Sequence, residues 1–121
     1  MSERQDKRQE LGRAGEAAAA DFLEGQGYTI QERNFRCSAG EIDLIATKDD
    51  FLVFIEVKAR KAGSPVHPSL SVTPRKQAKV RQLGQIYCVA HSRIVLQPRF
   101  DVVSVEIGDS GISVEHIENA F

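Results

Sequence analysis

The stretch FLVFIEVK at residues 51–58 restricts the fold more than any other part of the chain. It is an apolar run of strand length, and the side chains of a strand alternate between its two faces. One face is wholly apolar and holds Val53, Ile55 and Val57. The other face begins with two apolar residues and ends with Glu56 and Lys58. Buried charges are costly unless they are paired or bound to a metal, so this ending marks a site rather than core.

The elements around this strand predict an α/β fold. Helices are expected at residues 7–24 and 74–90, the second with Thr73 as its N-cap and Pro74 in its first turn. Strands are expected at residues 28–36, 41–46, 51–58, 100–106 and 112–117. Residues 47–50 read as a polar hairpin loop and residues 59–72 as irregular. The unit from the third strand to the fourth is a parallel crossover, which gives a mixed sheet with a helix on each side.

The composition fits one ordinary soluble domain. With 121 residues, the chain is expected to form a single domain over residues 1–121. No apolar run approaches the roughly 18 residues needed to span a bilayer, and the charged start lacks an apolar signal core. Cys37 and Cys88 have no metal-ligand spacing, so we expect free thiols in a reducing cytoplasm.

Charge is unevenly distributed along the chain. The net charge is −1, yet residues 57–100 contain nine Lys or Arg and no Asp or Glu. Such a segment makes a local positive field that the total hides. Its natural partner is a polyanion, with phosphate backbones as the leading candidate. A solvated basic surface explains the same pattern equally well.

Asp43 joins the charges of residues 51–58 through the hairpin register. With a four-residue loop Ala46 faces Phe51, which places Asp43 on the face of Glu56 and about 7–8 Å away along a diagonal. Glu41 then lies opposite Glu56 and joins as an outer member. A slip of one residue would move Asp43 to the other face, so the prediction depends on the register.

Glu16 is the acid on the first predicted helix that is best placed to reach the sheet. At about 100° per residue it projects beside Leu23, at the margin of the apolar stripe. Glu10, Asp21 and Glu24 project away from that stripe. Taken alone, Glu16 reads more simply as a surface glutamate at the core boundary.

Converging carboxylates at strand ends form a hard oxygen site that suits Mg²⁺, or Mn²⁺ in its place. The cation would relieve the repulsion between the acids, activate a water and stabilise charge on phosphorus. Lys58 would orient the attacking water or stabilise the phosphate. Arg75, Lys76 and Lys79 lie in the first turns of the second helix, whose N-terminus attracts anions. These features together predict metal-dependent hydrolysis of phosphodiester bonds.

The order of these pieces resembles a known nuclease superfamily. A helical Glu, a G-E-I-D-L strand, a short hairpin, an E-V-K strand and a basic helix are similar to the PD-(D/E)xK nucleases, in their Holliday-junction-resolvase branch. Nearly the whole chain resembles, more closely still, the uncharacterised bacterial YraN-like family. The matching pieces are GRAGEAAAADFL (12–23), RNFRCSAGEIDLIA (33–46), LVFIEVKAR (52–60), SVTPRKQAKV (71–80) and RFDVVSVE (99–106).

The resemblance implies a restriction-endonuclease-like core with a four-residue active site. Asp43 and Glu56 would hold the metal, and Lys58 would serve the water and the scissile phosphate. Glu16 would reach in from the first helix. Ile42 stands where the superfamily carries Pro, which is a common departure. Resolvase relatives act as homodimers on branched DNA, so the resemblance suggests a homodimer that binds duplex or branched DNA.

Basic side chains near these acids are the expected nucleic-acid contacts. They are Arg33, Arg36, Arg60, Lys61, Arg75, Lys76 and Lys79. For Arg33 and Arg36, structural salt bridges are an equally good reading. Asp101 is either an outer partner of the site or a simple ion-pair partner for Arg99.

Two other functions stay open at this point. The first is a non-catalytic nucleic-acid-binding or DNA-repair accessory protein on the same fold. The second is a small interaction protein with no nucleic-acid role. Nicking that needs Lys58 while DNA binding does not would separate an endonuclease from a binding protein. DNA binding that does not respond to salt would favour the interaction protein.

Overall fold

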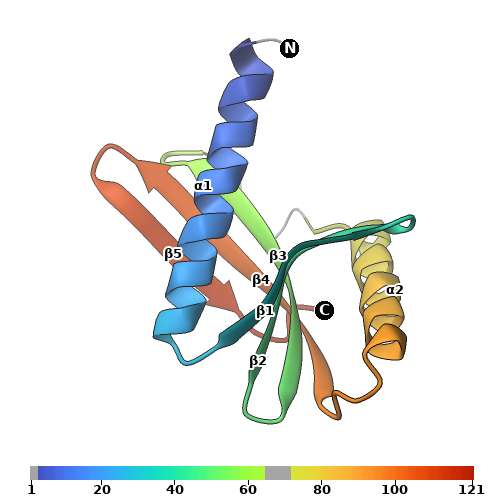
Figure 1. Ribbon diagram of the computed structural model, residues 1–121. Coiled ribbons are helices and arrows are strands. Elements are labelled where there is room, and N and C mark those ends of the chain that lie inside the picture. Colours follow the sequence, from blue (N-terminus) through green and yellow to red (C-terminus); the bar gives the residue numbers. More distant parts are fainter. Residues whose placement is uncertain (1–2, 65–71) are drawn as a thin grey trace.

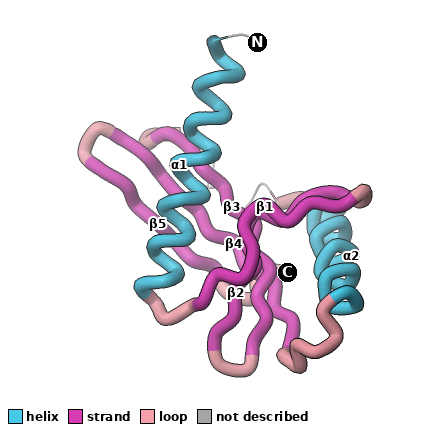
Figure 2. Tube along the Cα trace, viewed as in Figure 1, coloured by secondary structure: helices cyan, strands magenta, loops and turns pink. Residues whose placement is uncertain are grey.

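Two helices cover opposite faces of a five-stranded sheet in the computed structural model, which describes residues 3–64 and 72–121 (Figures 1 and 2). The helices are α1 (Glu3–Gly25) and α2 (Pro74–Ala90). The strands are β1 (Thr29–Cys37), β2 (Gly40–Lys48), β3 (Phe51–Lys61), β4 (Gln97–Gly108) and β5 (Gly111–Ile117). They lie in the order β1-β2-β3-β4-β5. Only the central β3–β4 pair of this sheet is parallel, so the predicted mixed sheet with a helix on each side is confirmed.

Strand β3 supplies both faces of the core, as its alternating pattern predicts. Val53 and Ile55 are fully buried in a cluster with Ala19 and Leu23 of α1. Phe54 belongs to a second cluster on the opposite face; its other buried members are Ile42, Ile45, Leu52, Leu83 and Tyr87. The charged end of β3 therefore emerges from a strand that is held between two helices.

Helix α2 begins and ends where the sequence predicts. The Thr73 hydroxyl accepts a hydrogen bond from the Lys76 backbone N–H at 3.1 Å, and Pro74 opens the first turn. The cap satisfies a backbone donor that has no partner within the helix. The buried face of the helix follows this capped first turn and includes Val80, Leu83 and Tyr87.

The β2–β3 hairpin is tighter than predicted. Lys48 pairs with Phe51 and Ala46 pairs with Val53, so the loop is only the two-residue turn of Asp49 and Asp50. The predicted pairing of Ala46 with Phe51 is therefore wrong by two residues. A shift of two keeps every side chain on its face, so Asp43 stays on the Glu56 side of the sheet.

The polar C-terminal end of β2 explains why the predicted register is wrong. Thr47 pairs with Thr29 of β1, and its hydroxyl accepts a hydrogen bond from the Gln31 amide at 3.0 Å. The Lys48 ammonium lies 5.0 Å from the centre of the Tyr28 ring. Polar residues that read as a loop thus find partners within the sheet.

Several other helices and strands are longer than predicted. Helix α1 begins at Glu3 and β4 at Gln97. Residues 59–61, expected to be irregular, continue β3 and pair with β4 as far as Ile107. Residues 65–71 of the predicted irregular segment lie outside the described residues. Within the described part of the chain, no helix combines the length and apolar character of a membrane span.

Helix α1 approaches β3 closely at Gly15. A methyl group added there would meet the Ala59 side chain at 2.5 Å, which is shorter than carbon–carbon contact allows. Gly12, one turn earlier, has open space around the same position. The close approach matters for function because the next residue along the helix is Glu16.

We predict opposite stability effects for two glycine substitutions in α1. Gly15→Ala should lower the free energy of unfolding by about 1–3 kcal/mol, because the methyl group forces α1 away from Ala59. Gly12→Ala should raise it by about 0.5–1 kcal/mol, because alanine restricts the unfolded chain and favours helix. Urea unfolding of both variants measures the two effects. Equal effects of the two substitutions would contradict the close approach.

Candidate functional site

Strand β2 leaves β3 at Asp43. The β2–β3 pairing ends at Leu44 and Ile55, although both strands continue. Leu44 packs in the cluster under α1, whereas Ile42 packs in the cluster under α2. Beyond Asp43 the β1–β2 hairpin turns away, and its tip lies beside α2 (Figure 1). The two strands therefore open into a fork.

The Asp43 carboxylate takes the place of the missing strand partner. Its Oδ2 accepts a hydrogen bond from the Val57 backbone N–H at 2.8 Å. A charge-assisted bond of this kind contributes about 1.5–3 kcal/mol. It also fixes Asp43 between Glu56 and Lys58, the chain neighbours of Val57.

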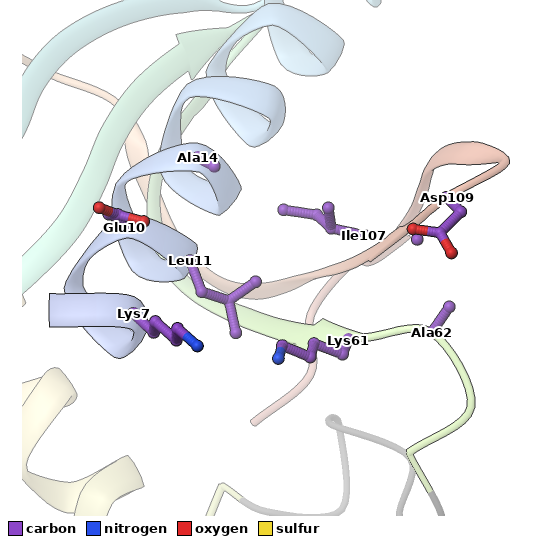
Figure 3. Close-up of a pocket in the computed structure, with 9 residues that line it drawn as sticks. Lys7, Glu10, Leu11, Ala14, Lys61, Ala62, Ile107 and Asp109 are labelled. Atoms are coloured by element: carbon purple, nitrogen blue, oxygen red, sulfur yellow. The ribbon is translucent and has the colours of Figure 1, made fainter. Parts of the chain in front are cut away.

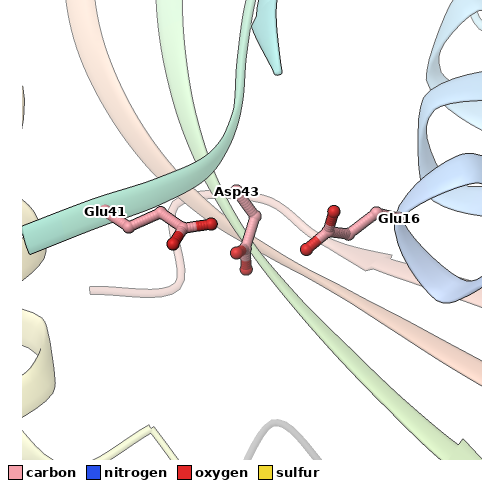
Figure 4. A group of neighbouring side chains, drawn as sticks. All are labelled: Glu16, Glu41 and Asp43. Carbon is pink, nitrogen blue, oxygen red and sulfur yellow. The ribbon is translucent and has the colours of Figure 1, made fainter. Parts of the chain in front are cut away.

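Three carboxylates meet at the fork. They belong to Glu16 of α1 and to Glu41 and Asp43 of β2. Each contributes one carboxylate oxygen, and the three oxygens lie within 4.8 Å of one another. Figure 4 shows Asp43 between the other two acids. With its amide nitrogen toward them, Asn34 donates to Glu16 at 3.1 Å and to Glu41 at 2.9 Å. Asn34 has a left-handed backbone (φ 53°), which asparagine tolerates better than most residues.

Glu56 lies in the same site but faces two lysines. Its Oε1 is 3.8 Å from the Lys58 ammonium and 3.8 Å from the Lys76 ammonium. The Glu56 side chain is only 9% exposed, so its charge depends on these partners. Among the described residues, the three-oxygen group within 4.8 Å does not include Glu56. Glu41 also does not lie opposite Glu56 as predicted, because the β2–β3 pairing ends at Leu44 and Ile55. Its partner in the sheet is Arg36 of β1.

Burial and mutual repulsion raise the pKa of every acid whose shift is resolved at the fork. Burial, together with the negative charge of Asp43, raises the pKa of Glu56 to about 7, against the opposing pull of Lys76 and Lys58. Burial also raises the pKa of Asp43, although the Val57 hydrogen bond counteracts it. The pKa of Glu16 is raised by burial and then by Asp43.

The donor set fits a hard divalent cation. All the candidate ligands are carboxylate oxygens, which Mg²⁺ and Mn²⁺ prefer. The hydrogen bond from Val57 engages one oxygen of Asp43 and leaves the other for a ligand. Burial, and to a smaller extent the charge of neighbouring acids, raises the pKa of Asp43 and of Glu56, and a cation at the fork would offset both effects.

Six of the seven predicted basic contacts fall into two groups. Arg33 lies 3.6 Å from Glu24, Arg36 donates to Glu41 at 3.1 Å, and Arg60 donates to Glu106 at 3.0 Å. These three arginines thus form the salt bridges that were the alternative reading for Arg33 and Arg36. The second group is exposed and comprises Lys61 at the end of β3, with Arg75 and Lys79 in the first turns of α2.

Sequence reasoning missed three features of this site. Asn34 bridges two acids. The sequence offers one hint of this role: an asparagine stands within a predicted strand, and asparagine tolerates a left-handed backbone. Arg13 lines a hollow of about 200 Å³ beside Glu16, together with Arg33 and Asn34. Lys76, which the sequence places among the nucleic-acid contacts, also approaches Glu56, and nothing in the sequence indicates that contact.

A buried ion-pair cluster lies outside the site. Asp101 is fully buried and accepts hydrogen bonds from Arg99 at 2.7 Å and from the Asn119 backbone N–H at 2.9 Å. The His116 Nε2 atom lies 2.6 Å from the same carboxylate. Burial favours a higher pKa for Asp101, but the His116 and Arg99 hydrogen bonds outweigh it and lower that pKa overall. Asp101 is thus the ion-pair partner of Arg99, which was the second of its two readings.

A larger hollow of about 610 Å³ lies between the N-terminal half of α1 and the ends of β3 and β4 (Figure 3). Its charged lining residues carry both signs: Lys7, Glu10, Lys61 and Asp109. It shares no residue with the acids of the fork. We therefore assign the candidate chemistry to the fork and not to this hollow.

Comparison with known proteins matches most of the chain to one family. The model of "Uncharacterised protein family UPF0102" matches residues 15–105. A UPF0102 protein of Desulfosudis oleivorans is 46% identical over 116 residues, which cover 96% of this chain and 93% of the relative. One from Clostridium botulinum (strain Loch Maree) is 44% identical over 117 residues, covering 93% and 94%. One from Syntrophomonas wolfei is 42% identical over 112 residues, covering 93% and 97%.

We predict that Glu56→Gln stabilises the metal-free protein in a pH-dependent way. Because the folded-state pKa of Glu56 is about 7 against an ordinary 4.5, the folded state binds more protons between these values. The free energy of unfolding of the wild type should therefore fall as pH rises through this window. In Glu56→Gln, which has no carboxyl group at this position, the free energy of unfolding should fall by up to about 3 kcal/mol less over the same pH range.

Urea unfolding in EDTA at pH 5 and pH 8 measures this difference. The stability of Glu56→Gln relative to the wild type should increase from pH 5 to pH 8. A relative stability that is the same at both pH values would show that Glu56 ionises in the folded protein as it does in the unfolded chain.

Proposed function

The chain belongs to the uncharacterised protein family UPF0102, and we propose that this member is a metal-dependent endonuclease acting on duplex or branched DNA. The observation that carries the proposal is the fork at Asp43, where carboxylates of α1 and β2 meet and Glu56 of β3 lies beside Lys58. The resemblance of this ordered set to the PD-(D/E)xK nucleases supports phosphodiester hydrolysis as the reaction. The YraN-like resemblance and the UPF0102 match concern the same family.

Asp43 and Glu56 are the proposed metal ligands, and Glu16 and Glu41 offer further oxygens beside Asp43. When bound, Mg²⁺ would supply polarisation of a phosphate oxygen and a water of lowered pKa. Asp43 suits its role because the Val57 hydrogen bond fixes its orientation before any ligand arrives. Glu56 suits its role because it is buried and its charge needs a cationic partner.

Lys58 is the proposed catalytic cation. It lies on the same strand face as Glu56, 3.8 Å from its carboxylate, and its side chain is 30% exposed. That exposure leaves the ammonium within reach of a bound phosphate. A positive charge at this point stabilises the negative charge that builds on the phosphate oxygens.

The basic surface of α2 is the proposed DNA-binding element. Arg75 and Lys79 are exposed on its first turns, and the N-terminus of a helix favours anions. Contacts with the phosphate backbone position a protein without reading bases. The proposal therefore concerns the shape of the substrate and not its sequence.

We predict metal-dependent nicking that requires Lys58. With Mg²⁺ or Mn²⁺, the protein should cut at least one substrate in a panel of linear, flapped and four-way DNAs. Lys58→Ala should reduce the rate by about 100-fold or more, because it removes charge stabilisation at the phosphate. Asp43→Ala should abolish cleavage and serves as the background control.

DNA binding measured in parallel separates this proposal from a binding protein. Lys58→Ala should keep its affinity for DNA within a few-fold of the wild type. If the wild type binds these DNAs but cuts none of them with either metal, the protein is a non-catalytic binder and the endonuclease proposal fails.

We also predict that α2 sets the salt dependence of DNA binding. The double variant Arg75→Ala/Lys79→Ala should reduce the slope of log K against log salt by about 2, because each phosphate contact contributes roughly 0.9. Arg93→Ala, beyond the other end of α2, is a single-charge control and should change the slope by clearly less than the roughly 0.9 of one phosphate contact. An unchanged slope in the double variant would exclude α2 as the contact.

A further inference from the structure

We propose that Lys76 is a second active-site cation, which helps to neutralise Glu56 in the metal-free protein and contacts the substrate phosphate once a divalent ion replaces it at Glu56. This inference rests on the proposed function. It differs from the resemblance to known nucleases, which assigns one lysine to the site. It also differs from the sequence prediction, which places Lys76 only on the surface that binds DNA.

The geometry at Glu56 is symmetrical. The ammonium groups of Lys58 and Lys76 each lie 3.8 Å from the same carboxylate oxygen, Oε1. They come from different elements, β3 and α2, and approach a side chain that is 9% exposed from positions that are 30% and 41% exposed. Both lysines therefore extend from the solvent side toward a buried charge.

The contact distance is too long for a direct hydrogen bond from either lysine to Glu56. Direct hydrogen bonds between an ammonium and a carboxylate are about 2.7–2.9 Å long. At 3.8 Å, the attraction between Lys76 and Glu56 is mainly electrostatic and imposes little geometry. A divalent ion at Glu56 would repel both ammonium groups, which would then be available to an anion in front of the site.

Hydrogen bonds hold the backbone at Lys76 in place. Its N–H donates to the Thr73 hydroxyl at 3.1 Å. The Gln77 amide donates to the Val72 carbonyl at 3.1 Å, which ties the same turn to the preceding chain. The first turn of α2 thus holds the Lys76 backbone in one position, with the side chain directed at Glu56. A residue that contacts substrate benefits from being preorganised in this way.

This role predicts opposite changes in metal affinity and turnover. Removing the Lys76 charge removes a competitor for Glu56, so a divalent ion should bind more tightly. The same change removes a positive charge from the substrate phosphate, so cleavage should slow. A lysine that only stabilised the fold would, when removed, weaken metal binding and turnover together.

The test compares Lys76→Gln, Lys76→Arg and the wild type. Isothermal titration with Mn²⁺ alone should show about three- to tenfold tighter binding by Lys76→Gln, given the screening of a partly exposed charge. At saturating Mn²⁺ and DNA, the turnover of Lys76→Gln should fall at least about tenfold. Lys76→Arg keeps the charge and should restore wild-type metal affinity and most of the turnover.

Arg81→Gln is the matched control. It removes one charge from the same helix, at a residue that lies over the Phe121 ring at 5.9 Å rather than beside the acids. Its Mn²⁺ affinity should equal that of the wild type. A thermal melt of each variant shows whether any change reflects loss of fold.

The outcomes distinguish this inference from the function on which it rests. If the wild type binds Mn²⁺ and cuts DNA but Lys76→Gln leaves both quantities unchanged, Lys76 has no active-site role. Weaker Mn²⁺ binding by a folded Lys76→Gln variant would also overturn the inference. If the wild type neither binds Mn²⁺ nor cuts DNA, the proposed function fails and the inference fails with it.

Discussion

The hydrogen bond from the Val57 backbone to Asp43 is the interaction on which the site depends. It forms where β2 stops pairing with β3, and it satisfies a donor that would otherwise be exposed at the fork. The same bond brings an acid of β2 against the charged end of β3. Strand separation, which normally costs ladder hydrogen bonds, here creates the space in which charged groups from α1, β2, β3 and α2 converge.

Much of the fold can be read from periodicity and capping. The alternation of β3 predicts which side chains face each helix, and Thr73-Pro74 locates the start of α2. The hairpin register could not be read in this way, because Thr47 and Lys48 look like loop residues until β1 is placed beside them. Local polarity and strand membership conflict there, and pairing across the sheet decides between them.

The candidate site is only partly visible in the sequence for a related reason. Helical geometry directs Glu16 toward the sheet, and alternation puts Asp43 on the face of Glu56. The approach of Lys76 to Glu56 and the Asn34 bridge join segments that no local period relates. They depend on the bend of the β1–β2 hairpin and on how α2 docks, both of which are set by packing.

The close contact between Gly15 and Ala59 fixes the position of α1 on the sheet by steric exclusion. If α1 moved by one residue along its own helical path, about 1.5 Å with a rotation of about 100°, Ala14 or Glu16 would have to occupy a space that admits no side chain. The position of Glu16 is therefore set by exclusion and not by attraction to the other groups of the fork. Changes of ionic strength, which weaken electrostatic attraction, should leave the helix in register.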